Sequence, residues 1–287
     1  MVGIVIRTLN ESELLGRCLE TLRRQEGGFD LDVVVVDSGS TDGTVDIARE
    51  HGARVIEIAP ADFDYSTALN VGIEEARGEL LVLLSAHAIP LDDHWLERMT
   101  APFADQRVAG VASGQVPWPG APWWEAVRLS RAFGDERRVF TAEAADGLLF
   151  SNAASCIRRS VWSETPFTLP AAEDLDWAER VIENGLAVVY EPAAMVYHSH
   201  DESPRAQARR MIDINRVAHD GARARVLRDG AGLVYRNGRS IMGLDEPLLR
   251  RAIYFRDLLR MAWFYVIDFS QSGSIAERRR DDAPAAV

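Results

Sequence analysis

The fold of this chain can be predicted from one stretch, Asp32-Val33-Val34-Val35-Val36-Asp37-Ser38-Gly39-Ser40-Thr41-Asp42-Gly43-Thr44. Four consecutive valines bounded by polar residues predict a strand buried on both faces, as in a parallel sheet. The strand is expected to end at Asp37, before a tight turn and a helix that Thr41 or Asp42 can cap. Ligands of open parallel sheets bind at the carboxyl ends of strands. Asp37 is therefore a candidate to bind a base N–H or a ribose hydroxyl; the alternative is that Asp37 and Asp42 only cap the turn.

Composition indicates a globular protein that does not bind nucleic acid. The chain has 287 residues, 47% of them hydrophobic, and a net charge of -12. This length suits one large domain or two small ones, and neutralising phosphates would need an excess of basic residues. Cys18 and Cys156 are too few for a disulfide framework and wrongly spaced for a zinc site, and Cys18 is expected in the core.

Apolar strands alternate with helical patterns through the first hundred residues. The predicted strands are 2–8, 33–36, 54–58, 80–84, 108–116, 150–157, 186–190 and 194–198. The predicted helices follow Asn10 as a cap, cover 44–51 and 68–76, and begin near Asp92, Trp123, Arg158 and Glu173. Strand, helix and strand in this order predict an α/β fold with a mostly parallel, doubly wound sheet and right-handed crossovers.

Two further groups of polar residues are candidates for chemistry. Glu173-Asp174 stands at a predicted helix start, where it can be an N-terminal cap or supply a general base that takes a proton from a hydroxyl. His198 and His200 alternate after a strand, so their side chains would point the same way and could contact a metal or phosphate. His87 ends an earlier strand.

Together these motifs resemble the family-2 glycosyltransferases, which have the GT-A fold. The resemblance covers roughly Val2 to His200. It rests on five motifs in order: Ile4–Glu11, Asp37–Thr44, Ala68–Gly72, Ala76–Glu79 and Glu173-Asp174. Residues 83–90, 114–117 and 197–200 look most like bacterial rhamnosyltransferases of cell-surface glycan assembly.

The resemblance implies an inverting transfer of a hexose or deoxyhexose from a nucleotide-diphosphate sugar to a hydroxyl of a carbohydrate, glycolipid or small molecule. Asp174 would be the base, and no second carboxylate is needed as nucleophile. Burial beside Glu173 would raise the pKa of Asp174 and favour proton uptake. The residues implied for nucleotide binding are Thr8, Asn10, Glu11, Asp37, Asp42, Asn70 and Ser85. Thr8 and Asp37 would hold the nucleobase, and Asn10, Glu11 and Asp42 would support that pocket.

The chain departs from the family where an Asp-x-Asp motif would bind ribose and a divalent cation. Ser85-Ala86-His87 stands there. Ser85 can still bind ribose, and His87 with His198 can hold a cation, Mn rather than Mg because Mg prefers oxygen ligands. The alternative is a site without metal, in which histidine or arginine neutralises the diphosphate. Leu69 replaces an arginine common in relatives, which Arg7 could compensate, and His200 is a further candidate ligand.

The chain is expected to divide after residues 100, 203 and 271. Residues 1–100 would bind the nucleotide sugar, 101–203 the acceptor, 204–271 would form a helical extension, and 272–287 a disordered tail. The arginines of 204–227 can be a solvated helix face or meet anionic lipid, and the aromatics of 248–269 can lie in a membrane interface, cover the core or form a homodimer contact.

The sequence contains no apolar run of about 18 residues, so no membrane-spanning helix is predicted. The first residues already have the pattern of a strand, so no signal peptide is expected before the fold. A cytoplasmic protein is expected, with a peripheral contact to the inner face of the membrane left open. Two other functions also remain open. A sugar-phosphate nucleotidyltransferase shares the sheet but needs a glycine- and arginine-rich loop that residues 7–10 do not provide. A non-catalytic nucleotide-sugar-binding protein is supported only by the changed residues Ser85 and His87.

Overall fold

The computed structural model describes residues 1–200, 203, 205–209, 212 and 248–271. The described chain forms two compact units, the first from Met1–Pro119 with Leu129–Ser199 and the second from Gly120–Arg128 with His200–Val287. The prediction of a disordered tail over 272–287 lies outside the described residues, as does most of the arginine-rich segment 204–227.

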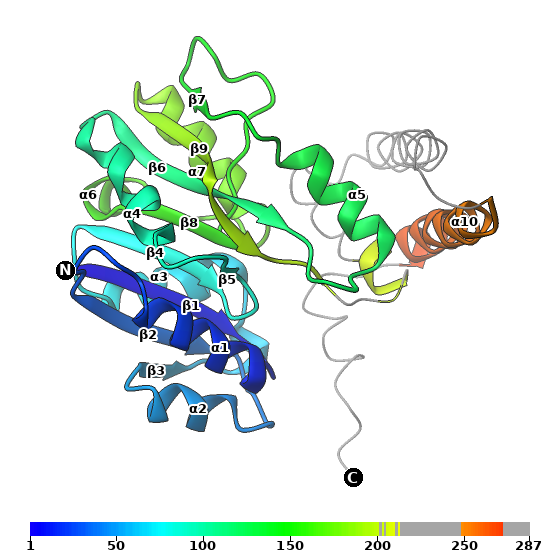
Figure 1. Cartoon of the computed structure of the whole chain (residues 1–287), viewed down its shortest axis with the longest axis horizontal. Coiled ribbons are helices and arrows are strands. Elements are labelled where there is room, and N and C mark those ends of the chain that lie inside the picture. The colour runs from blue at the N-terminus through cyan, green and yellow to red at the C-terminus, as the bar shows by residue number, and fades with distance from the viewer. Residues whose placement is uncertain (201–202, 204, 210–211, 213–247, 272–287) are drawn as a thin grey trace. The chain divides into compact units, whose positions relative to one another are not determined.

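The first unit is built on one mixed sheet of nine strands, in the order β3-β2-β1-β4-β8-β6-β9-β5, with β7 also paired to β9 (Figure 1). The strands are β1 Val2–Thr8, β2 Leu31–Asp37, β3 Arg54–Glu57, β4 Leu80–Ser85, β5 Ile89–Pro90, β6 Val108–Val116, β7 Arg138–Phe140, β8 Ala154–Arg158 and β9 Ala187–Tyr197. β1 to β4 pair in parallel, as do β6 and β9, and β8 runs antiparallel between β4 and β6. The carboxyl ends of six strands therefore meet at one edge of the sheet.

The prediction of a mostly parallel sheet is confirmed, but some strands differ from the sequence interpretation. The two short strands predicted over 186–190 and 194–198 are one continuous strand, β9, whose pairing with β6 shifts register after Ser113. Such a shift lets one strand absorb extra residues without ending. The strand predicted over 150–157 begins only at Ala154, and the short strands β5 and β7 were not predicted.

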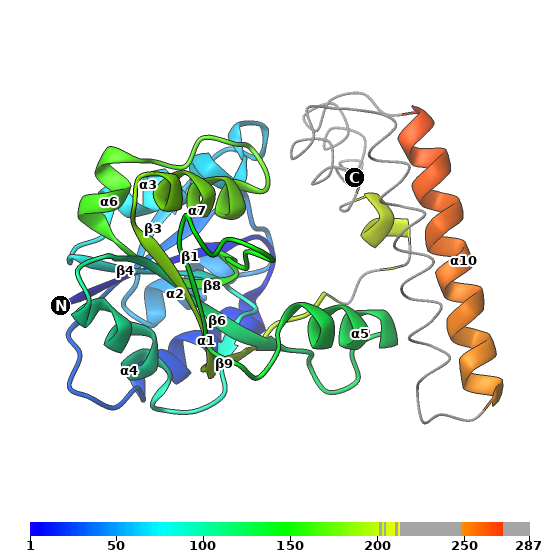
Figure 2. The same cartoon turned by 90° about the horizontal axis from the view of Figure 1, so that it is seen from above.

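Helices cover both faces of this sheet (Figure 2). The helices of the described residues are α1 Ser12–Arg23, α2 Thr44–Glu50, α3 Tyr65–Glu75, α4 Trp95–Thr100, α5 Trp123–Ala132, α6 Arg159–Glu164, α7 Glu173–Glu183 and α10 Leu248–Gln271, with 3-10 turns η1 Pro60–Asp62 and η2 Ala101–Ala104. Of these, α10 and most of α5 belong to the second unit. Buried residues of α1, α2 and α4 pack in one core, and those of α3 and α7 pack in a second core. α3 begins three residues before the predicted Ala68, because Asp64 accepts a hydrogen bond from the Thr67 N–H and caps the helix.

The valine strand lies between these two cores. Val35 packs in the core under α1, whereas Val34 and Val36 pack in the core under α3. Successive side chains of a strand point to opposite faces, so a run of valines suits a strand covered on both sides. All three are at most 1% exposed, which confirms the double burial predicted from the sequence.

Gly72 lets α3 approach this strand closely. A Cβ at residue 72 would lie 2.4 Å from Val5 Cγ1 and 2.9 Å from Val36 Cγ2. We expect Gly72→Ala to lower the free energy of unfolding by about 1–3 kcal/mol, because the two strands must move to make room. Urea denaturation measures this. Gly16→Ala in α1 is the control, since its Cβ would meet only Ile47 Cγ2 at 3.5 Å and alanine favours the helix; equal effects of the two changes would contradict the explanation.

In the second unit, aromatic residues of α5 pack against α10. The Trp123 ring stacks on that of Tyr254 with centroids 4.9 Å apart, and Leu258 and Met261 are buried beside it. The tryptophans at the start of α5 thus contribute to a hydrophobic core. None of the helices in the described ranges is long and apolar enough to cross a membrane.

Candidate active site

The loops that follow β1 and β2 are bonded to each other at the carboxyl edge of the sheet. The Ser38 N–H donates to the Thr8 carbonyl oxygen over 3.1 Å, and the Thr41 N–H donates to Asn10 Oδ1 over 2.8 Å. The Asn10 N–H donates in turn to Ser40 Oγ over 2.7 Å. Asn10 has a left-handed φ of 53°, which asparagine tolerates well. It joins the two loops and, contrary to the sequence prediction, does not cap α1.

Asp42 also has a structural role. Its Oδ1 accepts from the Thr44 N–H over 3.1 Å and its Oδ2 from the Ser12 N–H over 3.1 Å, so one carboxylate ties the starts of α1 and α2 together. Partial burial opposes ionisation, but the hydrogen bonds from Thr44 and Ser12 outweigh it and lower the pKa of Asp42. These contacts agree with a supporting role for Asp42 rather than contact with a nucleotide.

Asp37 and Thr8 hold polar atoms without a partner. Asp37 Oδ2 accepts from the N–H groups of Gly39 and Ser40 over 2.9 and 2.8 Å. Asp37 Oδ1 and Thr8 Oγ1 are buried and have no hydrogen-bond partner among the described residues. Leaving such an atom unpaired costs about 1–3 kcal/mol, so orphan atoms at a strand edge point to a ligand that completes them. Asp37 thus caps its turn and still offers an acceptor.

Two histidines stack at the same edge. His87 follows β4 and His198 follows β9, and their ring centroids lie 4.8 Å apart with 13° between the planes. His87 Nδ1 lies 2.6 Å from Glu11 Oε1, and His198 Nδ1 lies 2.8 Å from Gln115 Oε1. An oxygen acceptor at Nδ1 favours the tautomer with its proton there and orients the ring, as proteins commonly do for histidine ligands. Ligand nitrogens of His87 and His198 lie within 4.8 Å of each other.

This arrangement gives Glu11 a partner that the sequence did not predict and adds Gln115 to the candidate site. The Glu11 carboxylate contacts His87, while the Glu11 N–H donates to Thr44 Oγ1 over 2.9 Å. Gln115, 4% exposed, was not predicted as a site residue, although a glutamine inside the apolar run 108–116 is a signal that could have identified it. His200 begins the second segment of the second unit, where its N–H donates to Glu125 Oε2 over 3.3 Å.

Glu173 and Asp174 open α7 at this edge. Glu173 is 4% exposed, whereas Asp174 is only partly buried and can be reached by a substrate. Burial and the Asp174 charge raise the pKa of Glu173 to about 7, against the opposing effect of Arg7. Burial also raises the pKa of Asp174, against hydrogen bonds from the N–H groups of Leu175 and Asn152. The pair can therefore take up a proton near neutral pH.

Three side chains near this acidic pair have contacts that the sequence did not predict. Arg7 Nη1 lies 3.8 Å from Glu173 Oε1, so Arg7 contacts the acidic pair, and the diphosphate contact considered from the sequence stays a prediction. Asn152, 0% exposed, bonds both acids and was not predicted. The Asn70 amide donates to the Phe167 carbonyl oxygen over 2.8 Å and accepts from Trp162 Nε1 over 2.9 Å. Asn70 joins α3 to residues 162–167, and we leave it out of the site.

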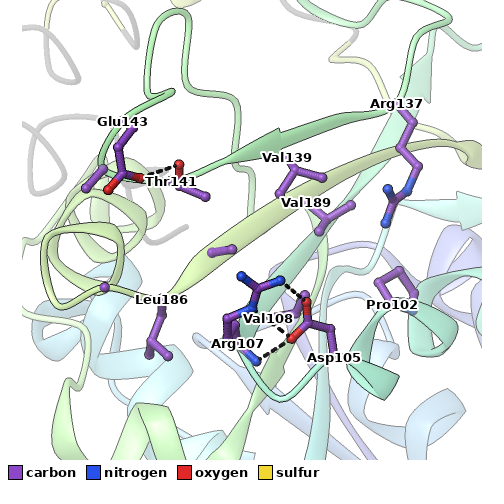
Figure 3. A pocket seen from close by; sticks show the side chains of 13 residues that line it. Pro102, Asp105, Arg107, Val108, Arg137, Val139, Thr141, Glu143, Leu186 and Val189 are labelled. Atoms are coloured by element: carbon purple, nitrogen blue, oxygen red, sulfur yellow. Dashed lines mark hydrogen bonds and ion pairs between the residues drawn. The ribbon is translucent and has the colours of Figure 1, made fainter.

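A separate pocket lies at the other end of the strands. Its cavity of about 440 Å³ is lined from the amino ends of β6 and β9 and from β7 (Figure 3). The two arginines that line it are paired with near neighbours: Arg107 with Asp105 at 2.8 Å, and Arg137 with Glu191 at 3.1 Å. Because ligands of such sheets bind at the carboxyl ends of strands, this pocket is not the candidate site.

Comparisons with known proteins agree with the sequence motifs. Residues 3–162 match the model of the family described as Glycosyl transferase family 2. The O-antigen chain rhamnosyltransferase WbaN of Salmonella anatum is 29% identical over 190 residues, which cover 63% of this chain and 60% of WbaN. The O-antigen chain rhamnosyltransferase RfbN of Salmonella typhimurium is 27% identical over 224 residues, which cover 74% of this chain and 70% of RfbN.

Solved structures show the same fold at low sequence identity. The mannosyltransferase PcManGT from Pyrobaculum calidifontis, in complex with GDP-Man and Mn2+, has a TM-score of 0.54 and 20% identity, covering 98% of this chain and 78% of that one. TarS 1-349 from S. aureus in complex with UDP-GlcNAc has a TM-score of 0.56 and 16% identity, and the match covers 96% of this chain and 77% of TarS 1-349. The predicted GT-A fold is confirmed. The family match covers more than half of the chain, and the chain therefore belongs to glycosyl transferase family 2.

Proposed function

We propose that the chain is an inverting glycosyltransferase that moves a sugar from a nucleotide-diphosphate donor to a hydroxyl acceptor. The observation that carries the proposal is the convergence of three groups at one edge of the sheet. These are the unpaired atoms of Thr8 and Asp37, the histidine pair His87 and His198, and the partly exposed Asp174. Family membership supports this function over the nucleotidyltransferase considered from the sequence.

Asp37 Oδ1 and Thr8 Oγ1 would bind the donor's base. A carboxylate oxygen accepts the ring N–H that uracil, thymine and guanine all carry, and a hydroxyl can donate to the neighbouring carbonyl. Ser85, at the end of β4, would contact the ribose. Similarity to rhamnosyltransferases favours a deoxysugar donor, and an acceptor in a cell-surface glycan. Contact with a membrane and a homodimer stay predictions.

His87 and His198 fit a divalent cation. Their Nδ1 atoms are held by Glu11 and Gln115, which is how proteins commonly orient histidine ligands. Imidazole nitrogen favours Mn over Mg, and His200 stays a predicted additional ligand. When bound, the cation would neutralise charge that develops on the departing diphosphate.

Asp174 would accept the proton of the acceptor hydroxyl. As the hydroxyl oxygen bonds to the anomeric carbon, the bond to the diphosphate oxygen breaks and its electron pair leaves with the diphosphate. A single displacement inverts the anomeric centre. The raised pKa of Asp174 suits this role, because a carboxylate of raised pKa is a stronger base.

A donor panel tests the function. Isothermal calorimetry would compare dTDP-rhamnose, UDP-N-acetylglucosamine and GDP-mannose with Mn and with EDTA, and release of nucleoside diphosphate would follow turnover. We expect one donor to bind and to be hydrolysed slowly, with tighter binding in Mn. Binding without turnover in the presence of a glycan acceptor mixture would favour the non-catalytic alternative. Absence of binding by every donor would contradict the proposed function.

Thr8→Val gives a sharper test of the base pocket. The change removes a buried hydroxyl that has no partner in the described residues, so we expect unchanged or slightly higher stability. We also expect the donor Kd to rise about three- to tenfold, because the loss of one hydrogen bond weakens binding by about this much. Thr21→Val is the control. Thr21 Oγ1 donates to the Arg17 carbonyl oxygen over 2.9 Å, so this substitution should lower stability and leave the donor Kd unchanged. An unchanged Kd in Thr8→Val would contradict the base contact.

A further inference from the structure

Arg7 is a buried cation behind the acidic pair. It follows Val5 by two residues on β1, so it points to the sheet face that α3 and α7 cover. Its side chain is 9% exposed, and its guanidinium carbon lies 4.9 Å from the centre of the Tyr65 ring at the start of α3. Glu173, at the start of α7, is 3.8 Å away. The cation is thus enclosed between two helix starts.

Asn152 connects this cation to both acids. Its carbonyl oxygen accepts from Arg7 Nη2 over 3.3 Å, and its N–H donates to Asp174 Oδ2 over 3.3 Å. Its side-chain Nδ2 donates to Glu173 Oε1 over 3.4 Å, while Oδ1 accepts from Ser155 Oγ over 2.9 Å. One fully buried residue, itself oriented by Ser155, therefore contacts all three charged groups. These bonds are long, and catalytic hydrogen bonds often tighten only when substrate binds.

The arrangement is poorly explained as a device for stability. Arg7 Nε and Nη1 are buried without a hydrogen bond to any described residue. Burying a charge costs several kcal/mol unless close ion pairs and hydrogen bonds repay it, and 3.8 Å is a loose ion pair. Groups held at such a cost concentrate at functional sites.

We propose that Arg7 and Asn152 form a clamp, the Arg7–Asn152 clamp, that positions the Asp174 carboxylate and keeps it ionised for proton transfer. Arg7 is then a positioning residue of the reaction, acting through the acidic pair. This inference rests on the proposed function, in which Asp174 is the base.

The clamp has a defined electrostatic consequence. Burial raises the pKa of both acids, and the Arg7 charge lowers the pKa of both. Within the described part of the chain, the pair is in contact with Arg7 from β1, against which Tyr65 from α3 packs, and with the uncharged Asn152. On α7 itself, Asp176 is already paired with Arg180 at 2.8 Å. Removing the Arg7 charge should therefore raise the pKa of the base, and activity should fall most at low pH.

The pH profile of kcat tests the clamp. Hydrolysis of dTDP-rhamnose, or of whichever donor the panel identifies, would be followed from about pH 5.5 to 9.5 in the full chain. We expect Arg7→Gln to move the acidic limb up by about one unit or more, so the rate falls about tenfold near pH 7 and recovers toward pH 9. The donor KM should stay within about twofold. Arg7→Lys keeps the charge and should shift the limb by less than about half a unit.

Arg180→Gln is the matched control. It removes the same charge from α7, but Arg180 contacts Asp176 and the Pro166 carbonyl oxygen rather than the pair. Its profile should match the wild type. Equal loss at every pH in Arg7→Gln, an unchanged profile, or a raised donor KM without a shift would each overturn the clamp. If Arg7→Gln does not fold, the Lys variant decides, because a shift of a full unit despite its charge would overturn the clamp. A wild-type protein that turns over no donor would instead contradict the proposed function, and the clamp with it.

Discussion

Asp174→Asn is expected to lower kcat for sugar transfer by about 10³-fold, within the range that a general base contributes. The amide keeps the shape of the side chain and can still accept from the Asn152 N–H, which lies 3.3 Å from Oδ2. It cannot accept the proton of the acceptor hydroxyl. Because Asp174 is not placed at the base pocket, the donor Kd from calorimetry should stay within about twofold, and the loss should appear in kcat.

Asp176→Asn is the matched control for this change. Asp176 lies on the same first turn of α7, and its carboxylate pairs with Arg180 on the surface at 2.8 Å. Its loss should leave kcat unchanged and cost at most about 1 kcal/mol of stability. An Asp174→Asn variant that retains transfer, or an Asp176→Asn variant that loses it equally, would contradict the assignment of Asp174 as the base.

Stability separates loss of chemistry from loss of fold in the Asp174 variant. The pKa of Asp174 is raised in the folded state, so the folded protein binds the proton more tightly than the unfolded chain. Such a group stabilises the fold when protonated, and that stability is lost as the pH rises through the folded pKa. The neutral amide avoids this loss. We therefore expect the Tm of Asp174→Asn to exceed that of the wild type near pH 8, and by a smaller margin near pH 5.

Much of the fold could be predicted because the signals are local. The four valines, the strand at 2–8 and the helix at 44–51 each follow from periodicity within a few residues, and all three occur within two residues of the predicted bounds. β9 was divided because Glu191 and Pro192 interrupt its apolar pattern. Only its pairing with β6, which shifts register there, keeps it continuous. β5 has two residues and is defined by its pairing with β9, so no local sequence pattern could predict it.

The candidate site was predictable where residues follow strand ends. Asp37, His87 and His198 were placed there from the sequence, and the sheet brings these ends to one edge. Gln115 and Asn152 were missed because their partners are distant in sequence: Gln115 is 83 residues from His198, and Asn152 is 21 residues from Glu173. A polar residue among buried apolar neighbours was the available signal.

Side-chain direction could not be predicted as well as position. Asn70 lies on the predicted helix, but the turn of α3 on which it sits faces Phe167 and Trp162. Glu11 follows β1 as expected, and its carboxylate contacts His87, a partner that the sequence did not indicate. Such choices depend on which distant segment packs alongside, and a single sequence does not carry that information.

His198→Phe is expected to abolish tight Mn binding and to lower kcat by about 10²-fold or more, the scale of the charge stabilisation that a cation supplies to a leaving group. Phenylalanine can keep a ring against His87, where the centroids now lie 4.8 Å apart, but offers no nitrogen. Calorimetry with Mn alone measures the first effect, and turnover at saturating donor measures the second. Gln115→Ala should weaken Mn binding about 10- to 100-fold, because it frees the Nδ1 side of the His198 ring.

His94→Phe is the control, since His94 is half exposed and contacts only surface acids, with Nδ1 3.5 Å from Glu97 Oε2. It should change neither Mn affinity nor kcat. If EDTA leaves wild-type turnover intact and His198→Phe keeps its kcat, the cation proposal is wrong, and side-chain cations must neutralise the diphosphate. If His198→Phe loses kcat but Mn binds the wild type no more tightly than the variant, His198 acts on the donor directly. The dependence of kcat on Mn therefore decides what replaced the Asp-x-Asp motif in this chain.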